Sequence, residues 1–188
     1  MSGSRILPGA LGALAFLAAG VVHADSVVAE KSEIDFTLKA MGVKFDGRFR
    51  KWKADVFFQP KALATSTAAI DVDLGSVDLA SSESETEAKG PLWFDTAKFP
   101  VAHFASTSIR DLGGDRYEVT GKLMLKGITH DCAVPLTVST DAAGNRVAEG
   151  TFSLKRLDYR IGEGEWADTA TVDNDILVHV RMVLKPTG

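Results

Sequence analysis

The segment YEVTGKLMLK, Tyr117 to Lys126, carries the pattern that decides the fold. Its apolar residues fall at every second position and are Tyr117, Val119, Leu123 and Leu125. Successive side chains of a β-strand point to opposite faces, so this alternation predicts a strand with one apolar and one wetted face. Gly121 falls on the apolar face, where a missing side chain permits tight curvature or a close approach.

The same two-residue period recurs along most of the chain. The segments that show it are 34–40, 43–49, 52–58, 70–74, 132–138, 152–154 and 176–184. A slip of the period near Arg50 and Lys51 predicts a bulge or bend, and turn signals such as DLGGD, Asp111 to Asp115, separate the segments. About eight or nine strands follow, which predicts an all-β, antiparallel domain closed as a barrel or folded as a sandwich.

One segment, LASSESETEAKGP from Leu79 to Pro91, breaks the strand pattern. Ser82 with Glu85 three residues later forms a capping-box signal, and Gly90-Pro91 forms a stop signal. A short helix is therefore predicted here. It has too few apolar residues for a core helix, so we expect it to lie across the end of the barrel or sheet.

The N-terminal residues 1–24 have the pattern of a cleaved secretory signal peptide. Arg5 precedes an apolar run from Ile6 to Val22, and small residues flank the expected cleavage site after Ala24. Residues 25–188 then form a single domain, and the predicted location is the periplasm. A retained membrane anchor is the weaker interpretation, because Pro8 and Gly9 interrupt the apolar run.

Composition and residue spacing exclude several functional classes. The formal charge of −4 and the lack of a basic run argue against nucleic acid as a partner. Cys132 is the only cysteine, so no internal disulfide can form. His103, His130 and His179 show no metal-ligand spacing, and no nucleophile motif is present. The sequence therefore predicts a protein that is not an enzyme, with no catalytic residue, metal or cofactor.

The stretch IGEGEWADTATVDND, Ile161 to Asp175, combines a tryptophan with several acids. Calcium is the rival interpretation, but the residues after Asp168 lack the alternating acids, glycine and glutamate of an EF-hand loop. We expect the acids to be solvated and Trp166 to fold over the barrel mouth as a lid or plug.

The chain resembles the YceI-like family of lipid- and polyisoprenoid-binding proteins over most of Ser32 to Lys185. The segments that carry the resemblance are SEIDFTLKAMGVKFDGRFRKWKADVFFQP, WFDTAKFPVAHFASTSIR and VTGKLMLKGITHDCAVPL. The ending RLDYRIGEGEWADTATVDNDILVHV is similar to a subgroup associated with cytochrome b561-type membrane proteins. The resemblance implies a lipocalin-like antiparallel β-barrel whose interior holds a long isoprenoid. The acidic ESETEAKGPLW departs from the Asp-His-Leu segment that many members have in the helix region.

A barrel of about eight strands is wide enough for packed side chains or for one small apolar ligand. The residues predicted to line it are Phe36, Phe45, Phe49, Trp52, Phe58, Ile70, Val72, Trp93, Phe94, Phe104, Leu123, Leu125, Phe152, Leu154 and Trp166. Ordinary core packing is the alternative role for each of them.

Two functional hypotheses follow from the export signal, the strand pattern and the resemblance. The first is non-enzymatic binding, transport or scavenging of an isoprenoid or quinone-like lipid inside the barrel. The second is an accessory partner of a cytochrome b561-type electron-transfer protein, with a barrel largely filled by side chains. The sequence leaves the formation of a homodimer open.

Overall fold

A computed structural model describes residues 25–186, so the predicted signal peptide lies outside the described residues. It contains an 11-stranded sheet. The strands are β1 (Ser26–Val27), β2 (Glu33–Ala40), β3 (Val43–Phe49), β4 (Trp52–Phe57), β5 (Thr67–Asp73), β6 (Val77–Asp78), β7 (Val101–Gly113), β8 (Arg116–Leu125), β9 (Ile128–Thr140), β10 (Arg146–Lys155) and β11 (Asp175–Lys185). One α-helix, α1 (Ser82–Lys89), and the 3₁₀ turns η1 (Ala29–Lys31), η2 (Leu63–Thr65), η3 (Leu74–Ser76), η4 (Arg156–Tyr159) and η5 (Gly164–Trp166) complete the described elements.

All strand pairs are antiparallel, and the sheet curls until its ends meet at a corner. The strand order is β4-β5-β7-β8-β9-β10-β11-β2-β3-β6. Only Arg50 and Lys51 separate β3 from β4, and η3 similarly joins β5 to β6. Because β3 pairs with β6 and β4 with β5, two bent strands turn the same corner and close the sheet. If β3 and β4 are counted as one bent strand, β5 and β6 as another, and the two-residue β1 is omitted, about eight strands remain. The predicted antiparallel barrel is therefore confirmed.

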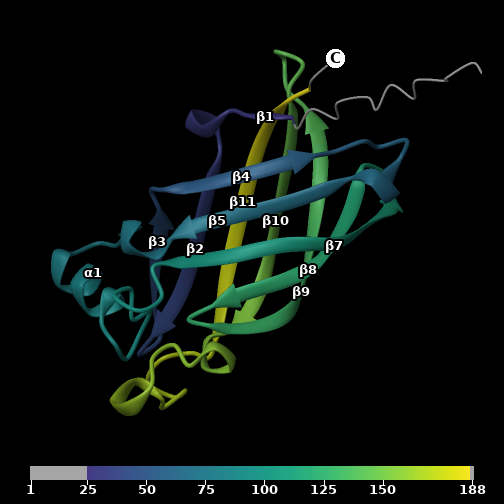
Figure 1. Cartoon of the computed structure of the whole chain (residues 1–188). Helices are drawn as coiled ribbons and strands as arrows, with labels where there is room; N and C mark the ends of the chain where they lie inside the picture. The colour runs from purple at the N-terminus through teal and green to yellow at the C-terminus, as the bar shows by residue number, and fades with distance from the viewer. Residues whose placement is uncertain (1–24, 187–188) are drawn as a thin grey trace, which may run out of the picture.

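Figure 1 shows how strongly the sheet curls, with β4, β5, β7 and β8 crossing over β2, β10 and β11. The short β1 joins the two layers at one end. Ser26 pairs with Lys185 of β11, while the backbone amide of Asp25 donates to the carbonyl of Val56 on β4 (2.8 Å). At the opposite end lie α1 and the chain between β10 and β11.

The two-residue period located most strands but not β7. Its alternation is broken by register shifts between Ser106 and Ser108 and between Asp111 and Gly113. The predicted slip at Arg50 and Lys51 is the corner described above. The predicted close approach at Gly121 is also present, because a Cβ atom there would lie 2.5 Å from the carbonyl oxygen of Ala105.

The predicted short helix exists, but its predicted cap was one residue too late. The N-cap is Ser81, whose hydroxyl accepts a hydrogen bond from the amide of Ser84 (3.1 Å). Ser82 is already the first helical residue, because Ser81 rather than Ser82 has the extended backbone that a cap requires. Within residues 25–186, no helix is long and apolar enough to cross a membrane.

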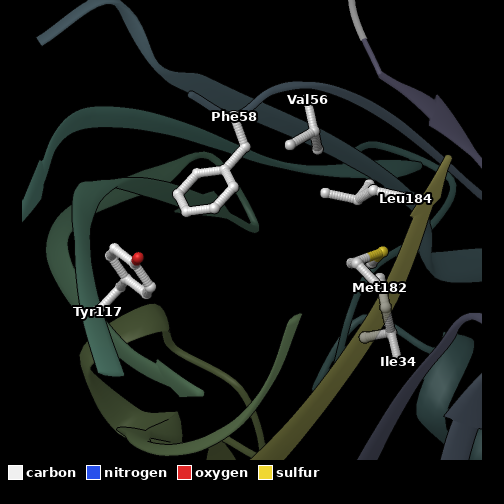
Figure 2. Close-up of a cluster of buried hydrophobic side chains, with 6 residues drawn as sticks. All are labelled: Ile34, Val56, Phe58, Tyr117, Met182 and Leu184. Atoms are coloured by element: carbon white, nitrogen blue, oxygen red, sulfur yellow. The ribbon is translucent and has the colours of Figure 1, made fainter. Parts of the chain in front are cut away.

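The buried apolar side chains form two clusters. One contains Ile34, Val56, Phe58, Tyr117, Met182 and Leu184 (Figure 2). The other, near α1 and η4, contains Leu74, Ala102, Leu125, Tyr159 and Ile161. Many inward-facing residues between them are only half-buried, such as Phe104 and Val178. A close-packed interior would bury these side chains fully, so the barrel is hollow along its middle.

Candidate functional site

The central feature of the molecule is an elongated cavity of about 1250 Å³ inside the barrel. This volume exceeds the roughly 300–1,000 Å³ of ordinary small-molecule pockets. Its wall is almost entirely apolar and is built from the inward faces of the long strands. On β8 the inward positions are those that the two-residue period identified, since Leu123 and Leu125 line the cavity while Lys122 is exposed.

Most of the residues predicted to line the barrel lie on the cavity wall. They are Phe36, Phe45, Phe49, Phe58, Ile70, Val72, Trp93, Phe94, Phe104, Leu123, Leu125, Phe152, Leu154 and Trp166. Their placement is geometric, and their contact with a ligand stays a prediction. Phe45 stands at the rim, where it is 42% exposed.

Trp52 corrects the predicted set, because it does not line the cavity. It has the same alternation as Val56 and Phe58, which do line it. However, Trp52 is the first residue after the corner, where its side chain packs against the first apolar cluster and borders a small groove with Glu30 and Ser32. The bend at the corner therefore removes its indole from the wall.

The structure adds lining residues that the predicted set left out. They include Ile34, Leu38, Tyr117, Val119, Ile176, Val178, Val180, Met182 and Leu184. All of these fall on inward positions of strands that the period predicted, so parity alone could have found them. The lining residues of α1 could not be found in this way, because only the tertiary structure places this helix at the cavity.

The mouth of the cavity lies between the β2–β3 hairpin and α1. On the hairpin side, Met41 is 77% exposed and lines the mouth together with Phe45. On the helix side, Glu83 and Glu87 line the mouth. The helix rim is thus acidic, while the hairpin rim also carries Lys44 and Asp46 beside its apolar residues.

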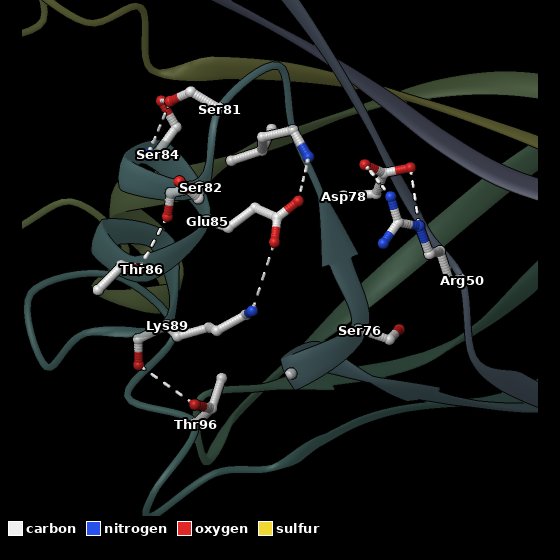
Figure 3. A network of polar contacts seen from close by, with 12 residues as sticks. Arg50, Ser76, Asp78, Ser81, Ser82, Ser84, Glu85, Thr86, Lys89 and Thr96 are labelled. Atoms are coloured by element: carbon white, nitrogen blue, oxygen red, sulfur yellow. Dashed lines mark hydrogen bonds and ion pairs between the residues drawn. The ribbon is translucent and has the colours of Figure 1, made fainter.

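A polar network holds α1 at this mouth (Figure 3). The Glu85 carboxylate accepts a hydrogen bond from the amide of Leu79 (3.4 Å) and pairs with Lys89 (3.7 Å). Beneath the helix, Arg50 at the barrel corner pairs with Asp78 of β6 (2.6 Å). These contacts attach the helix to the corner of the barrel and so fix one rim of the entrance.

The chain between β10 and β11 forms a cap over the same end of the cavity, which we call the end cap (residues 156–174). Trp166 lines the cavity, stacks at 5.8 Å from Trp93 in a tilted arrangement and donates its indole N–H to Glu87 of α1 (3.1 Å). The indole therefore links the end cap to the helix. This placement agrees with the predicted lid position, although motion of a lid stays a prediction.

The acids of the end cap are engaged locally. Asp168 accepts hydrogen bonds from the amide of Ala170 (2.9 Å) and the hydroxyl of Thr171 (3.1 Å). Glu163 pairs with Arg160 (2.9 Å), and this hydrogen bond lowers the pKa of Glu163. The arrangement is that of a polar turn, and these contacts account for Asp168 without a cation.

Two buried cations order the end cap. The Arg156 side chain is fully buried, and Lys126 is 8% exposed. Lys126 Nζ donates to the carbonyls of Pro91 (3.0 Å) and Arg160 (2.6 Å), joining the chain after α1 to the end cap. Burial lowers the pKa of both groups. Arg156 donates to backbone carbonyls of the end cap, and Lys126 also pairs with Glu163 (3.7 Å), so both cations serve to order the loops.

Replacing Trp166 with Ala is expected to speed ligand release while leaving the fold intact. The substitution removes the stack on Trp93 and the hydrogen bond to Glu87, which together contribute about 1–2 kcal/mol. Arg156 still binds the backbone carbonyl of residue 166 (2.7 Å). The dissociation rate of a bound prenyl quinone, measured by stopped-flow displacement, should rise roughly tenfold with little change in melting temperature. Trp166→Phe, which keeps an aromatic ring at this position, is the matched control. An unchanged release rate in both variants would contradict the role of Trp166 as a lid.

The remaining candidate groups lie apart from the cavity. Burial raises the pKa of Cys132 to about 11, which keeps the thiol protonated and poorly nucleophilic at neutral pH. Among residues 25–186, the ligand atoms of Glu33, Asp35 and His179 lie within 4.8 Å of one another. They face outward on β2 and β11, where His179 also contacts Glu149 (3.1 Å). Asp35 also lies 3.8 Å from Arg48, and the absence of a metal stays a prediction.

The family model described as the YceI-like domain matches residues 26–184. The chain belongs to the YceI-like family. A UPF0312 protein of Shewanella denitrificans is 30% identical over 144 residues, which cover 74% of this chain and 73% of that protein.

Two solved structures have a similar fold. BcnA of Burkholderia cenocepacia is 34% identical with a TM-score of 0.81, covering 84% of this chain and 99% of BcnA. A polyisoprenoid binding domain from Saccharophagus degradans is 19% identical with a TM-score of 0.71, covering 88% of this chain and 99% of that domain. The second likeness concerns the fold alone. Together they confirm the predicted lipocalin-like barrel for this YceI-like chain.

Proposed function

We propose that this protein is a non-enzymatic carrier or scavenger that binds an isoprenoid or quinone-like lipid inside the barrel. The observation that carries the proposal is the apolar cavity of about 1250 Å³ with one polar-rimmed mouth. Family membership and the polyisoprenoid binding domain among the structural neighbours support the same ligand class.

The chemistry of the wall fits a long apolar chain. Aliphatic and aromatic side chains surround the cavity from β2 through β11, and its charged lining residues belong to the mouth and the end cap. Burying roughly ten methylene equivalents would contribute about 8 kcal/mol before the cost of association is subtracted. The binding free energy therefore becomes more favourable as the apolar chain lengthens, and no charged anchor along the barrel is required.

We place the function in the periplasm, because the pattern of residues 1–24 is that of a cleaved signal peptide. Cleavage after Ala24 would leave Asp25 at the N-terminus, beside the bridge to Val56 that joins β1 to β4. The intact mass of the exported protein tests this placement.

Filling the cavity should abolish binding without unfolding the barrel. Ala148 on β10 lines the cavity opposite open space, so Ala148→Phe places a ring where the ligand chain would lie. We expect the affinity for a prenyl quinone to fall by more than tenfold. The added ring prevents the burial of several methylene groups, and each buried methylene contributes about 0.8 kcal/mol. Tryptophan-fluorescence titration measures the affinity, and native mass spectrometry measures co-purified lipid.

Ala133→Phe on β9 is the matched control, because Ala133 is exposed on the outer face of the barrel. This variant should bind like the wild type. Two results would contradict the proposal: a wild-type protein that takes up no prenyl quinone and carries no hydrophobic molecule, or an Ala148→Phe variant that binds as tightly as the wild type.

A further inference from the structure

The end of the cavity opposite the mouth contains a buried tyrosine that the proposed function does not yet use. Tyr117 lines the cavity and is 8% exposed. Its ring meets Phe58 edge-on, with centroids 5.1 Å apart. In Figure 2, Tyr117 and Phe58 lie across the barrel interior from Met182 and Ile34, and all four residues line the cavity. Each of these four residues is at most 8% exposed.

The hydroxyl of Tyr117 has no hydrogen-bond partner among residues 25–186. The nearest cation, Arg146, is committed elsewhere, because it donates to the carbonyl of Phe58 (3.0 Å) and contacts Asp25 (3.4 Å). In the described part of the chain, two side-chain polar atoms are both fully buried and without a hydrogen-bond partner, namely Asp35 Oδ1 and Trp93 Nε1. The Tyr117 hydroxyl is not one of them, so it borders space that another atom can occupy.

Tyr117 is also the one polar group of the described cavity wall that stands away from the mouth. The other lining residues with polar side-chain atoms are Lys44, Asp46, Ser81, Glu83, Ser84, Glu87, Trp93, Arg156 and Trp166. All of these belong to the hairpin rim, α1 and its following loop, or the end cap. Leu125, which packs near Trp93, lies eight residues from Tyr117 along β8, or about 26 Å at ~3.3 Å per residue. A single hydrogen-bonding site therefore ends a long apolar tunnel.

A hydroxyl without a hydrogen-bond partner among apolar groups is unfavourable, and a ligand oxygen that pairs with it removes this penalty. Burial raises the pKa of Tyr117, so the phenol is neutral near pH 7 and can donate or accept a hydrogen bond. The carboxylates of Asp111 and Asp115 raise the same pKa, and together with the apolar wall they disfavour an ionised phosphate at this end.

We propose that Tyr117 anchors a neutral oxygen, a hydroxyl or carbonyl, at the end of the lipid that lies deepest in the barrel. The inference rests on the proposed function and deepens it by naming the ligand class as an uncharged, oxygen-bearing isoprenoid. The oxygenated end enters first, and the hydrocarbon extends toward the mouth at Phe45 and α1.

The test is a cycle of two proteins and two ligands. Wild type and Tyr117→Phe are titrated with a C20 isoprenoid alcohol and with the C20 isoprenoid hydrocarbon of the same branching. The anchor predicts that Tyr117→Phe weakens binding of the alcohol by about fivefold to tenfold, the effect of one neutral hydrogen bond. Binding of the hydrocarbon should stay the same or tighten slightly.

Tyr159→Phe is the matched control, because Tyr159 is 4% exposed and does not line the cavity. Its alcohol-to-hydrocarbon affinity ratio should equal that of the wild type. Equal losses for both ligands in Tyr117→Phe would mean that Tyr117 only packs, and no loss for either would mean that the alcohol binds with its hydrocarbon end inward. Either result overturns the anchor but leaves lipid binding intact, whereas a wild type that binds neither ligand overturns the proposed function as well.

Discussion

Replacement of Arg156 by Met is expected to destabilise the protein by about 3–5 kcal/mol, a loss comparable to that from breaking a buried ion pair. The guanidinium is fully buried and donates to backbone carbonyls from several turns of the end cap. The acceptors are the carbonyls of Ile161 (3.0 Å), Gly162 (2.7 Å), Trp166 (2.7 Å), Val172 (2.8 Å) and Asp173 (3.0 Å).

The physical reason for the size of this effect is the nature of the acceptors. A buried ion pair can be replaced by apolar residues because both partners are removed together. Here the partners of Arg156 are main-chain carbonyls, which no side-chain substitution can remove. Met fills a similar volume but leaves these acceptors without donors, at about 1–3 kcal/mol for each that stays buried. The end cap should therefore open to hydrate them.

Urea denaturation measures the global loss, and amide hydrogen exchange across residues 156–174 measures the local opening. Arg156→Lys retains the charge but has fewer donors in a different geometry, so we expect an intermediate loss. Arg110→Met is the exposed control: Arg110 pairs with Glu118 on the surface (2.7 Å), and its loss should change stability by less than about 1 kcal/mol. Equal unfolding free energies for Arg156→Met and Arg110→Met would contradict the role assigned to Arg156.

The substitution Gly150→Ala is expected to cost about 3 kcal/mol, at the upper end of the effects of overpacking. A Cβ atom at Gly150 would lie 2.0 Å from the carbonyl oxygen of Pro135, and 2.8 Å from a methyl of Leu136. Because the first contact is backbone, no side-chain rotation relieves it, and one strand must move.

The position of Gly150 explains why the approach is so close. The pairing of β10 with β9 runs from Arg146 to Glu149 and ends there, while its pairing with β11 continues to Lys155. Gly150 is thus the point at which β10 separates from β9 across the face of Pro135, a residue that has no N–H to donate to a ladder. Farther along, His130 of β9 instead bonds to the carbonyl of Asp158 in η4 (3.1 Å).

Thermal and urea denaturation test this expectation. Gly75→Ala is the control, because Gly75 is exposed and the nearest atom to an added Cβ is a carboxylate oxygen of Asp73, at 3.1 Å. Its effect should stay below about 1 kcal/mol. If Gly150→Ala proved equally mild, β9 and β10 would have to separate more freely than their packing indicates.

Much of the candidate site could be predicted from parity. Leu123, Leu125 and Phe104 needed only the knowledge that strand side chains alternate and that the apolar face points inward. For Trp52 the same rule gave a wrong prediction, because the corner at Arg50 and Lys51 changes the orientation of the chain. A two-residue period does not encode the angle of a corner. The strand β7 escaped it because its register shifts interrupt the alternation.

Other parts depended on contacts between distant segments. Trp166 meets Glu87 across 79 residues of sequence, and Arg146 meets Asp25 across 121. No local pattern selects such partners, since each side chain offers the same donors or acceptors to many others. The burial of Arg156 likewise follows from the arrangement of the end cap around it, and in the sequence it is one arginine among many.

The sequence alone determined that this protein is an antiparallel β-domain with an apolar inner face and a short acidic helix, because strand period and capping residues are local properties. The tertiary structure decided that the barrel is hollow, that α1 and the end cap stand at its mouth, and that Tyr117 closes its inner end. Whether inward side chains meet or leave a tunnel depends on strand tilt, closure and the corner between β3 and β4. These are properties of the assembled sheet, and the same alternating pattern is compatible with a filled barrel and with a hollow one.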